Sequence, residues 1–467
     1  MKKDTAKKYI WILVAVIVYA VIANISLPGD LSVEGQRAIA LMVAAVIIWS
    51  TEVVPVGFAS IALPMLTAVL GICSLGSTLS NFMSTTIIFM ISSQLIAQAF
   101  VKTGVGQRVG LKISFVFGDK PKHVLLAFML ATGIISMFLV DIPTAIIFAG
   151  IAYSLLEQNG CKPGQSKYGM AMMIGIPIAA AIGGFATPVG SGLNQLAIGQ
   201  LKAATGITIN FAQWCMVGVP MAIILLFAAW FIITKALPAE IDKVAGADTI
   251  KEQSAAMGKL STDEKKFIAI FAVTVILWVT NPLTGIDNNM VAALSACCMA
   301  LPGINLLSGD YIKKGVDWAG IMLVGGATAI AMTLSSTGAS AWIASLLTNA
   351  LGSMSIPMVI LTVSIFAIFI HVIVPTGGAL VALFVPIMAG VAINLGMSPA
   401  ILALIIGYTV SCVFLVPLDP IPLTTYGYKY WKMFDMTKIG LIISIVWIVL
   451  LFVFMVAANS LGLYPMA

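Results

Sequence analysis

Charged side chains are scarce in this sequence. Asp, Glu, Lys and Arg together make up 9% of its 467 residues and only two residues are histidines, whereas roughly 25% of an ordinary soluble domain is charged. Hydrophobic residues make up 60%, and one charge-free run, 318–418, is several times longer than the ~20 apolar residues that one membrane crossing needs. The composition therefore excludes a soluble domain and predicts an all-α polytopic membrane protein in a lipid bilayer.

Cysteine is also sparse, and its spacing excludes two kinds of site. The six cysteines form neither a metal-binding pattern nor a disulfide framework. The net charge of +6 comes mostly from loop residues that set membrane topology, so it does not indicate a nucleic-acid partner.

The amino-terminal residues MKKDTAKK precede an apolar run that is too long for the core of a signal peptide. We therefore expect a retained first helix, with its lysines and the N-terminus in the cytoplasm, because positive charge accumulates on that side. The compact chain with short loops favours a multi-pass protein of a prokaryotic plasma membrane.

Polar residues divide the rest of the sequence into crossings. The stretch 238–266, rich in Lys, Glu, Asp and Ser, is predicted to be a cytoplasmic linker between two halves. Two apolar segments, 122–157 and 355–394, are too long for one straight helix and carry a Pro in the middle. The predicted crossings lie near 9–28, 36–54, 57–75, 122–157, 168–190, 211–236, 266–282, 287–302, 355–394, 399–418 and 437–461.

The two halves repeat the same order of features. Each has a Ser/Gly-rich apolar segment and then a helix that breaks at a Pro/Thr cluster, "VDIPTAIIFAG" in one and "IVPTGGALVALFVP" in the other. A second break follows in each, "GGFATPVGSGLN" and "LVPLDPIPLTT". Paired, Gly/Pro-interrupted apolar segments are the sequence sign of a secondary transporter with internal repeats. Backbone freed at such breaks suits carboxylates at helix N-termini and small cations at exposed carbonyls.

Two segments resemble a known family. "STEVVPVGFASIALPML" (50–66) and "PIAAAIGGFATPVGSGLN" (177–194) are similar to signature segments of the divalent anion/sodium symporters. The resemblance implies a homodimer of elevator-type transporters for di- and tricarboxylates such as succinate, malate, 2-oxoglutarate or citrate. It also implies two inverted repeats, with re-entrant hairpins near 80–105 and 316–340 and broken helices at 122–157 and 355–394. No cofactor is expected, apart from sodium as a candidate co-transported ion.

The resemblance also divides the chain between a scaffold and a moving body. The expected parts are scaffold helices at 1–79, transport elements of the first repeat at 80–210, scaffold helices with the linker 238–266 at 211–315, transport elements of the second repeat at 316–436, and a C-terminal helix at 437–467.

The sequence departs from the family at the breaks in both predicted broken helices, where the family carries Ser-Asn-Thr. This chain has Asp141-Ile142-Pro143-Thr144 in the first half and Thr376-Gly377-Gly378 in the second. The side-chain oxygens of the missing Ser and Asn would help to hold sodium in the family. Their loss favours exchange of one dicarboxylate for another over sodium symport, which stays open as the alternative. An intramembrane aspartyl protease using Asp141 and Asp419 is a remote third hypothesis, and an ion channel is a fourth.

Candidate site residues follow from these segments. A charge inside the bilayer costs at least ~2.5–3.5 kcal/mol, so Asp141 and Asp419 are functional candidates, although Asp141 also suits a helix cap. His371 is either a proton relay or a histidine bonded to a neighbouring helix, and Glu52 is interpreted as interfacial and structural. The hydroxyl and amide residues of 187–194 bind substrate or cation, or else pack helices together. The predicted substrate-binding residues are Pro143, Thr144, Thr187, Pro188, Ser191, Asn194, Thr376, Gly377 and Gly378; the coupling candidates are Asp141, Gly190, His371 and Asp419, with sodium expected near Asp141 and Thr376.

Overall fold

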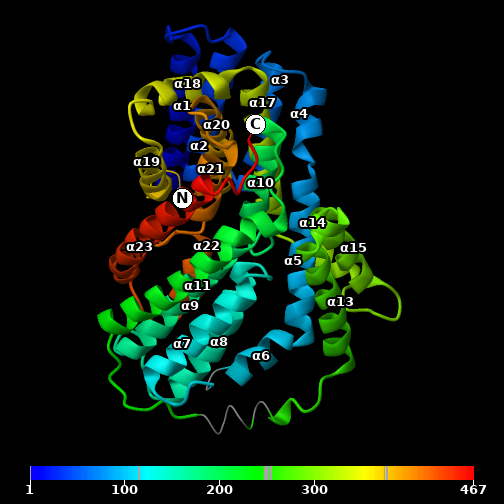
Figure 1. Cartoon of the computed structure of the whole chain (residues 1–467), viewed down its shortest axis with the longest axis vertical. Helices are drawn as coiled ribbons and strands as arrows, with labels where there is room; N and C mark the ends of the chain where they lie inside the picture. Colours follow the sequence, from blue (N-terminus) through cyan, green and yellow to red (C-terminus); the bar gives the residue numbers. More distant parts are fainter. Residues whose placement is uncertain are drawn as a thin grey trace.

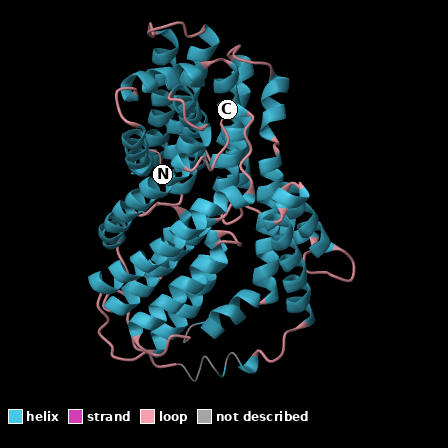
Figure 2. Cartoon of the chain, viewed as in Figure 1, coloured by secondary structure: helices cyan, strands magenta, loops and turns pink. Residues whose placement is uncertain are grey.

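The computed structural model describes residues 2–113, 116–246, 252, 255–372, 374 and 377–466, and for 2–7 and Asn81 the backbone alone. Over these residues the chain is helical, without a strand (Figures 1 and 2). The helices are α1 (Lys2–Asn24), α2 (Val33–Thr51), α3 (Val56–Val69), α4 (Leu75–Phe82), α5 (Thr85–Thr103), α6 (Val105–Ile113), α7 (Pro121–Ser136), α8 (Asp141–Gln158), α9 (Lys167–Ala186), α10 (Gly192–Thr205), α11 (Phe211–Ala236), α13 (Thr262–Val279), α14 (Asn281–Thr284), α15 (Asn288–Ala300), α16 (Gly309–Lys314), α17 (Trp318–Ser336), α18 (Ala339–Leu351), α19 (Ile356–Phe369), the 3-10 helix η1 (Ile370–Val372), α20 (Gly377–Asn394), α21 (Pro399–Thr409), α22 (Pro420–Tyr426) and α23 (Met433–Ser460).

The membrane-protein prediction is confirmed. Within the described part of the chain, seven helices are long and apolar enough to cross a bilayer. A further pair, α18 followed by α19 with η1, is bent by 119° at a short break.

The segment 121–158, here called hairpin 1, reverses direction, so that it begins and ends at the same end of the molecule. Both ends of this segment bond to the linker: the Val244 N–H donates over 2.8 Å to the carbonyl of Asp119, two residues before α7, and the side chain of Asn159, directly after α8, donates to the Ala245 carbonyl over 2.8 Å. Phe128 of α7 and Phe148 of α8 stack edge to face, with ring centroids 6.3 Å apart. Because these rings lie about equally far from the turn at 137–140, α7 and α8 run antiparallel, with Asp141 at the tip.

The segment 356–394, here called hairpin 2, has the same form in the other half. Phe366 of α19 and Phe384 of α20 stack with ring centroids 5.0 Å apart. The end of α20 returns to the end of α18, where the Asn394 side chain donates to the Thr348 hydroxyl over 3.3 Å. Hairpin 1 occupies the lower part of the molecule and α20 the upper part, so the two hairpins enter from opposite ends (Figure 1).

A broken helix follows each hairpin, and the halves interlock. Helices α9 and α10 are separated by break 1 (187–191), and α21 and α22 by break 2 (410–419). Helix α20 of hairpin 2 packs against α10, and α22 packs against α8 and α9. The predicted repeat order of hairpin and broken helix is therefore present, and the elements of one half complete those of the other.

The predicted positions of the hairpins were wrong. Segments 80–105 and 316–340 contain the single helices α5 and α17, and the hairpins are the segments 122–157 and 355–394 that were predicted to be broken helices. The serines of α5 bond within the helix, since the Ser92 hydroxyl donates to the Ile88 carbonyl over 2.7 Å. In α17, a Cβ on Gly326 would lie 2.3 Å from the Ser60 carbonyl oxygen, so this glycine permits close packing on α3 rather than a turn.

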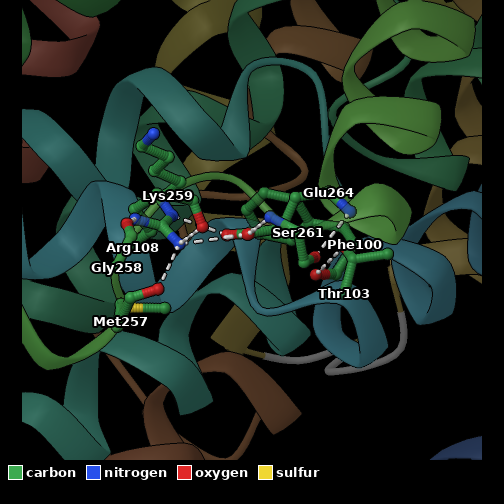
Figure 3. Close-up of polar contacts among 8 residues, drawn as sticks. All are labelled: Phe100, Thr103, Arg108, Met257, Gly258, Lys259, Ser261 and Glu264. Atoms are coloured by element: carbon green, nitrogen blue, oxygen red, sulfur yellow. Dashed lines mark hydrogen bonds and ion pairs between the residues drawn. The ribbon is translucent and has the colours of Figure 1, made fainter.

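The linker is fastened to the amphipathic helix α6 by one buried ion pair (Figure 3). The Arg108 guanidinium donates to both Glu264 oxygens, over 2.6 Å and 3.0 Å, and also to the carbonyls of Met257 and Gly258. Glu264 closes a capping box with Ser261 at the start of α13. Helix α6 packs on hairpin 1, so the pair connects that hairpin to the scaffold side of the linker.

Candidate functional site

One cavity of ≈ 510 Å³ lies where all four interruptions meet. The hairpin tips contribute Asp141 and Gly377, and the breaks contribute Ser191 and Asp419. The remaining wall comes from the turn between α2 and α3, from α5 and from α17. We call this cavity the main cavity. Backbone that is interrupted at membrane depth is stable only when it is buried in protein or lines a wet cavity, and the main cavity provides such a lining position for all four interruptions.

The described lining of the main cavity is acidic. It includes Glu52, Asp141, Asp317 and Asp419, and no Lys, Arg or His. Glu52 was interpreted as structural, but it lines the cavity from the turn after α2. Glu52 and Asp317 are exposed and Asp419 is partly buried, but Asp141 is buried, and a buried carboxylate is stable only when it is protonated or paired with a cation. The main cavity therefore favours a bound cation or proton beside Asp141.

The tip of hairpin 1 and the end of α9 form a cluster of oxygens around Gly184 and Gly190. A Cβ on Gly190 would lie 2.6 Å from the Gly184 carbonyl oxygen and 2.7 Å from the Ser136 carbonyl oxygen. A Cβ on Gly184 would lie 3.0 Å from Oδ2 of Asp141. Glycine is therefore required at Gly190, and a larger residue at Gly184 would have to displace the Asp141 side chain. The two carbonyls and the carboxylate can serve a hard cation such as sodium. We call this group the hairpin 1 cradle.

Asp141 combines a structural and an electrostatic role in the cradle. It is 5% exposed, begins α8, and its Oδ1 accepts the Ile142 N–H over 2.8 Å. Oδ1 therefore fixes the helix start, while Oδ2 faces Gly184. Pro143 lies in the first turn of α8, where proline is tolerated because its missing N–H has no helical partner.

Thr187 and Asn194 connect break 1 to the cradle. The Thr187 hydroxyl donates to the Met137 carbonyl at the tip of hairpin 1. The Asn194 side-chain amide donates to the carbonyls of Gly184 and Thr187, over 2.8 Å each, and its buried Oδ1 has no hydrogen-bond partner. These two predicted binding residues lie behind the cavity wall with Thr144 and Pro188, all buried, whereas Ser191 lines the cavity and caps α10.

The tip of hairpin 2 lies against break 1. A Cβ on Gly377 would lie 2.7 Å from Cδ1 of Leu193 and 2.9 Å from Cγ2 of Val410, so no larger residue fits there without displacement. Gly378 also lines the main cavity. Thr376 and the preceding Pro375 lie outside the described residues.

His371 does not line the main cavity. It is buried in η1, 7% exposed, and neither ring nitrogen has a hydrogen-bond partner among the described residues. It lines a separate small cavity together with Asp419, which lines both.

Sequence reasoning missed the backbone part of the site. The carbonyls of Ser136 and Gly184 carry no side-chain signal, and Asp317 was not singled out although it is the charged residue directly before the long charge-free run. Asp317 caps α17 by accepting the Gly320 N–H over 3.1 Å.

Comparisons with known proteins agree with this arrangement. A family model for the transmembrane region of sodium:sulfate symporters matches residues 6–463. The chain is 27% identical over 463 residues to the sodium-dependent dicarboxylate transporter SdcS of Staphylococcus saprophyticus, covering 92% of this chain and 88% of that one. It is 25% identical to SdcS of Staphylococcus aureus, covering 93% and 88%.

Two solved structures share the fold. The YdaH transporter of Alcanivorax borkumensis has a TM-score of 0.62 at 13% identity, covering 99% of this chain and 100% of that one. Neisseria gonorrhoeae MtrF, described among antimetabolite efflux pumps, has a TM-score of 0.58 at 13% identity, covering 97% and 94%. Because the family model spans nearly the whole chain, the protein belongs to the sodium:sulfate symporters, that is, the divalent anion/sodium symporter family, and is a transporter rather than an enzyme.

Proposed function

We propose that this protein is a sodium-coupled dicarboxylate symporter of the plasma membrane. The observation that carries the proposal is the main cavity, which is lined by all four helix interruptions and by acidic side chains. The names of the SdcS relatives support both the dicarboxylate and the sodium dependence.

Charge balance favours symport over the exchange reading drawn from the altered Ser-Asn-Thr positions. A dicarboxylate adds negative charge to a cavity whose described lining has carboxylates and no basic side chain. Two unit charges 4 Å apart interact by about 4 kcal/mol at an effective dielectric constant near 20. The anion therefore enters only with cations, and the hairpin 1 cradle offers an oxygen site for sodium.

The carboxylates of the substrate would bind at helix N-termini. Helices α10 and α20 begin at the cavity with Gly192 and Gly377, and they are 14 and 18 residues long. The N–H groups of their first turns and the partial positive charge of their N-termini suit carboxylates without a basic side chain. Leu193 and Leu323 line the same cavity and suit the aliphatic middle of the substrate.

In an elevator mechanism, the two hairpins and the two broken helices, which pack against one another, would move together as one body. This body comprises α7–α10 and α19–α22, and the scaffold comprises α2, α3 and α17, which pack together, with α13–α15. The main cavity lies between the two, which is where a carrier of this kind holds its substrate. We propose a homodimer through the scaffold; the mass of the detergent-solubilised protein tests this.

Transport by the purified protein in proteoliposomes tests the proposed function. Uptake of labelled succinate should require external sodium and should not require internal dicarboxylate, with choline as the replacement cation. Replacing Asp141 with Asn should raise the sodium concentration for half-maximal uptake at least ~10-fold, equivalent to about 1.4 kcal/mol, because the cradle loses its charge. Replacing the exposed Asp242 of the linker with Asn is the control. Sodium-independent uptake that needs internal succinate would instead establish exchange.

A further inference from the structure

His371 is a buried histidine without a hydrogen-bond partner. Among the described residues neither ring nitrogen has a hydrogen-bond partner, although leaving a buried polar group unpaired is unfavourable. The residue lies at the tip of hairpin 2, inside the interlocked elements. An unpaired imidazole in this position needs a hydrogen-bonding partner. The cavity beside it indicates the chemical nature of that partner.

The small cavity beside His371 has a volume of ≈ 10 Å³, about the space that one water molecule occupies. The described part of its wall is apolar except for three groups: His371, Asp419 and the Cys412 thiol. The thiol is engaged with the Ser444 hydroxyl of α23 at 3.3 Å. His371 and Asp419 are therefore the two groups free to share a ligand there.

Asp419 connects this small cavity to the main cavity, because it lines both. Its Oδ1 accepts the Ile421 N–H over 3.0 Å and caps α22, which leaves Oδ2 for another partner. The other charged groups around the main cavity are Asp141 of hairpin 1, Glu52 of the α2–α3 turn and Asp317 of α17, all acidic. The charged side chains that line the main cavity with Asp419 are thus all acidic, and they favour an added positive charge there.

We propose that His371 and Asp419 form a proton-binding pair, so that a proton moves with sodium and the dicarboxylate. This proposal rests on the proposed function and adds a second coupling ion to it. A hydronium ion that enters the main cavity gives its proton to Oδ2 of Asp419 and becomes water, and the proton passes, directly or through one water, to the lone pair of a His371 ring nitrogen. The product is an imidazolium paired with a carboxylate, which is neutral overall, and the same proton leaves by the reverse steps on the other side.

A measurement of proton movement tests this pair. The full-length protein is reconstituted in phosphatidylcholine/phosphatidylglycerol vesicles that contain a pH-sensitive dye, with the membrane potential clamped. Labelled succinate is added under an inward sodium gradient, at a slightly alkaline pH where it is a dianion and carries no proton itself. We expect internal acidification that tracks succinate uptake and disappears when sodium is replaced by choline.

Two substitutions and one control identify the groups. His371→Gln and Asp419→Asn should each lower the ratio of protons to succinate to near zero during sodium-driven uptake, because neither side chain can then hold the proton. His123→Gln changes the only other histidine of the chain, in the first turn of α7, and should keep the wild-type ratio.

The outcomes separate this proposal from the proposed function. Sodium-driven uptake by the wild-type protein without acidification overturns the proton pair alone, whether or not the variants fold. A wild-type proton ratio in His371→Gln, or a loss in His123→Gln, also overturns it. Absence of sodium-driven succinate uptake in the wild type overturns the proposed function and this proposal together.

Discussion

At the scale of single residues, the glycine positions of the cradle tolerate fewer side chains than the position of its charged group, Asp141. Gly190 faces two carbonyl oxygens at distances that no Cβ tolerates, so its side chain must be a hydrogen atom. The same closeness brings the Ser136 and Gly184 carbonyls together, and exposed carbonyls are what a sodium site at a broken helix uses. Steric fit and cation binding thus depend on one residue.

Gly190→Ala should therefore reduce sodium-dependent succinate uptake at least ~10-fold. The methyl group would displace the carbonyls, and overpacking of this kind costs typically 1–3 kcal/mol. The control is Gly150→Ala in α8 of the same hairpin, where a Cβ would meet nothing within 4 Å. Equal uptake by both variants, at equal amounts of folded protein in the membrane, would show that these carbonyls do not hold the coupling ion.

At the scale of helices, the sequence predicted the interruptions but not the way the chain turns at them. Pro143, Pro188 and Gly377 mark places where a helix cannot continue, and each of the predicted breaks lines or adjoins the main cavity. Whether a break straightens or reverses the chain depends on long-range contacts, such as the pairing of Phe366 with Phe384. The family resemblance placed the hairpins on the segments of α5 and α17, which are rich in serine and glycine, but helix packing uses the same residues.

The ion pair between α6 and α13 should show its effect in acid. Hydrogen bonds from Arg108 lower the pKa of Glu264 to about 2, below its unfolded value of about 4.3. Because the unfolded chain then binds more protons, this stabilisation is complete above the unfolded pKa and is lost as the pH falls toward 2.

Unfolding of the detergent-solubilised protein as a function of pH measures this contribution. Glu264→Gln should lower the unfolding temperature at neutral pH, since it leaves a buried guanidinium without its carboxylate. As the pH falls toward 2, the unfolding temperature of this variant should decrease less steeply than that of the wild type. Asp263→Asn, at a neighbouring side chain that is 53% exposed, is the control. An acid decline that is equally steep in Glu264→Gln would assign it to other carboxyl groups.

At the scale of the whole molecule, an elevator mechanism requires contacts between the moving body and the scaffold to break in each cycle. One such contact joins α10 to α17, where the Gln200 side chain donates to the Thr328 hydroxyl over 3.1 Å. The pair is buried, and Gln200 Oε1 has no hydrogen-bond partner among the described residues. The contact is therefore only partly satisfied, as expected for one that breaks in each cycle. It offers a place to join the two bodies covalently.

Cross-linking at this contact tests the assignment of the two bodies. In a variant without the six native cysteines, Gln200→Cys with Thr328→Cys should stop succinate uptake once the thiols are bridged, and reduction should restore it. Thr274→Cys with Ser295→Cys joins α13 to α15 within the scaffold, where the native hydroxyls are 2.7 Å apart, so bridging there should leave uptake intact. Continued uptake with the first pair fully bridged would mean that α10 and α17 move together, and the boundary between carrier and scaffold would then lie on the other side of α17.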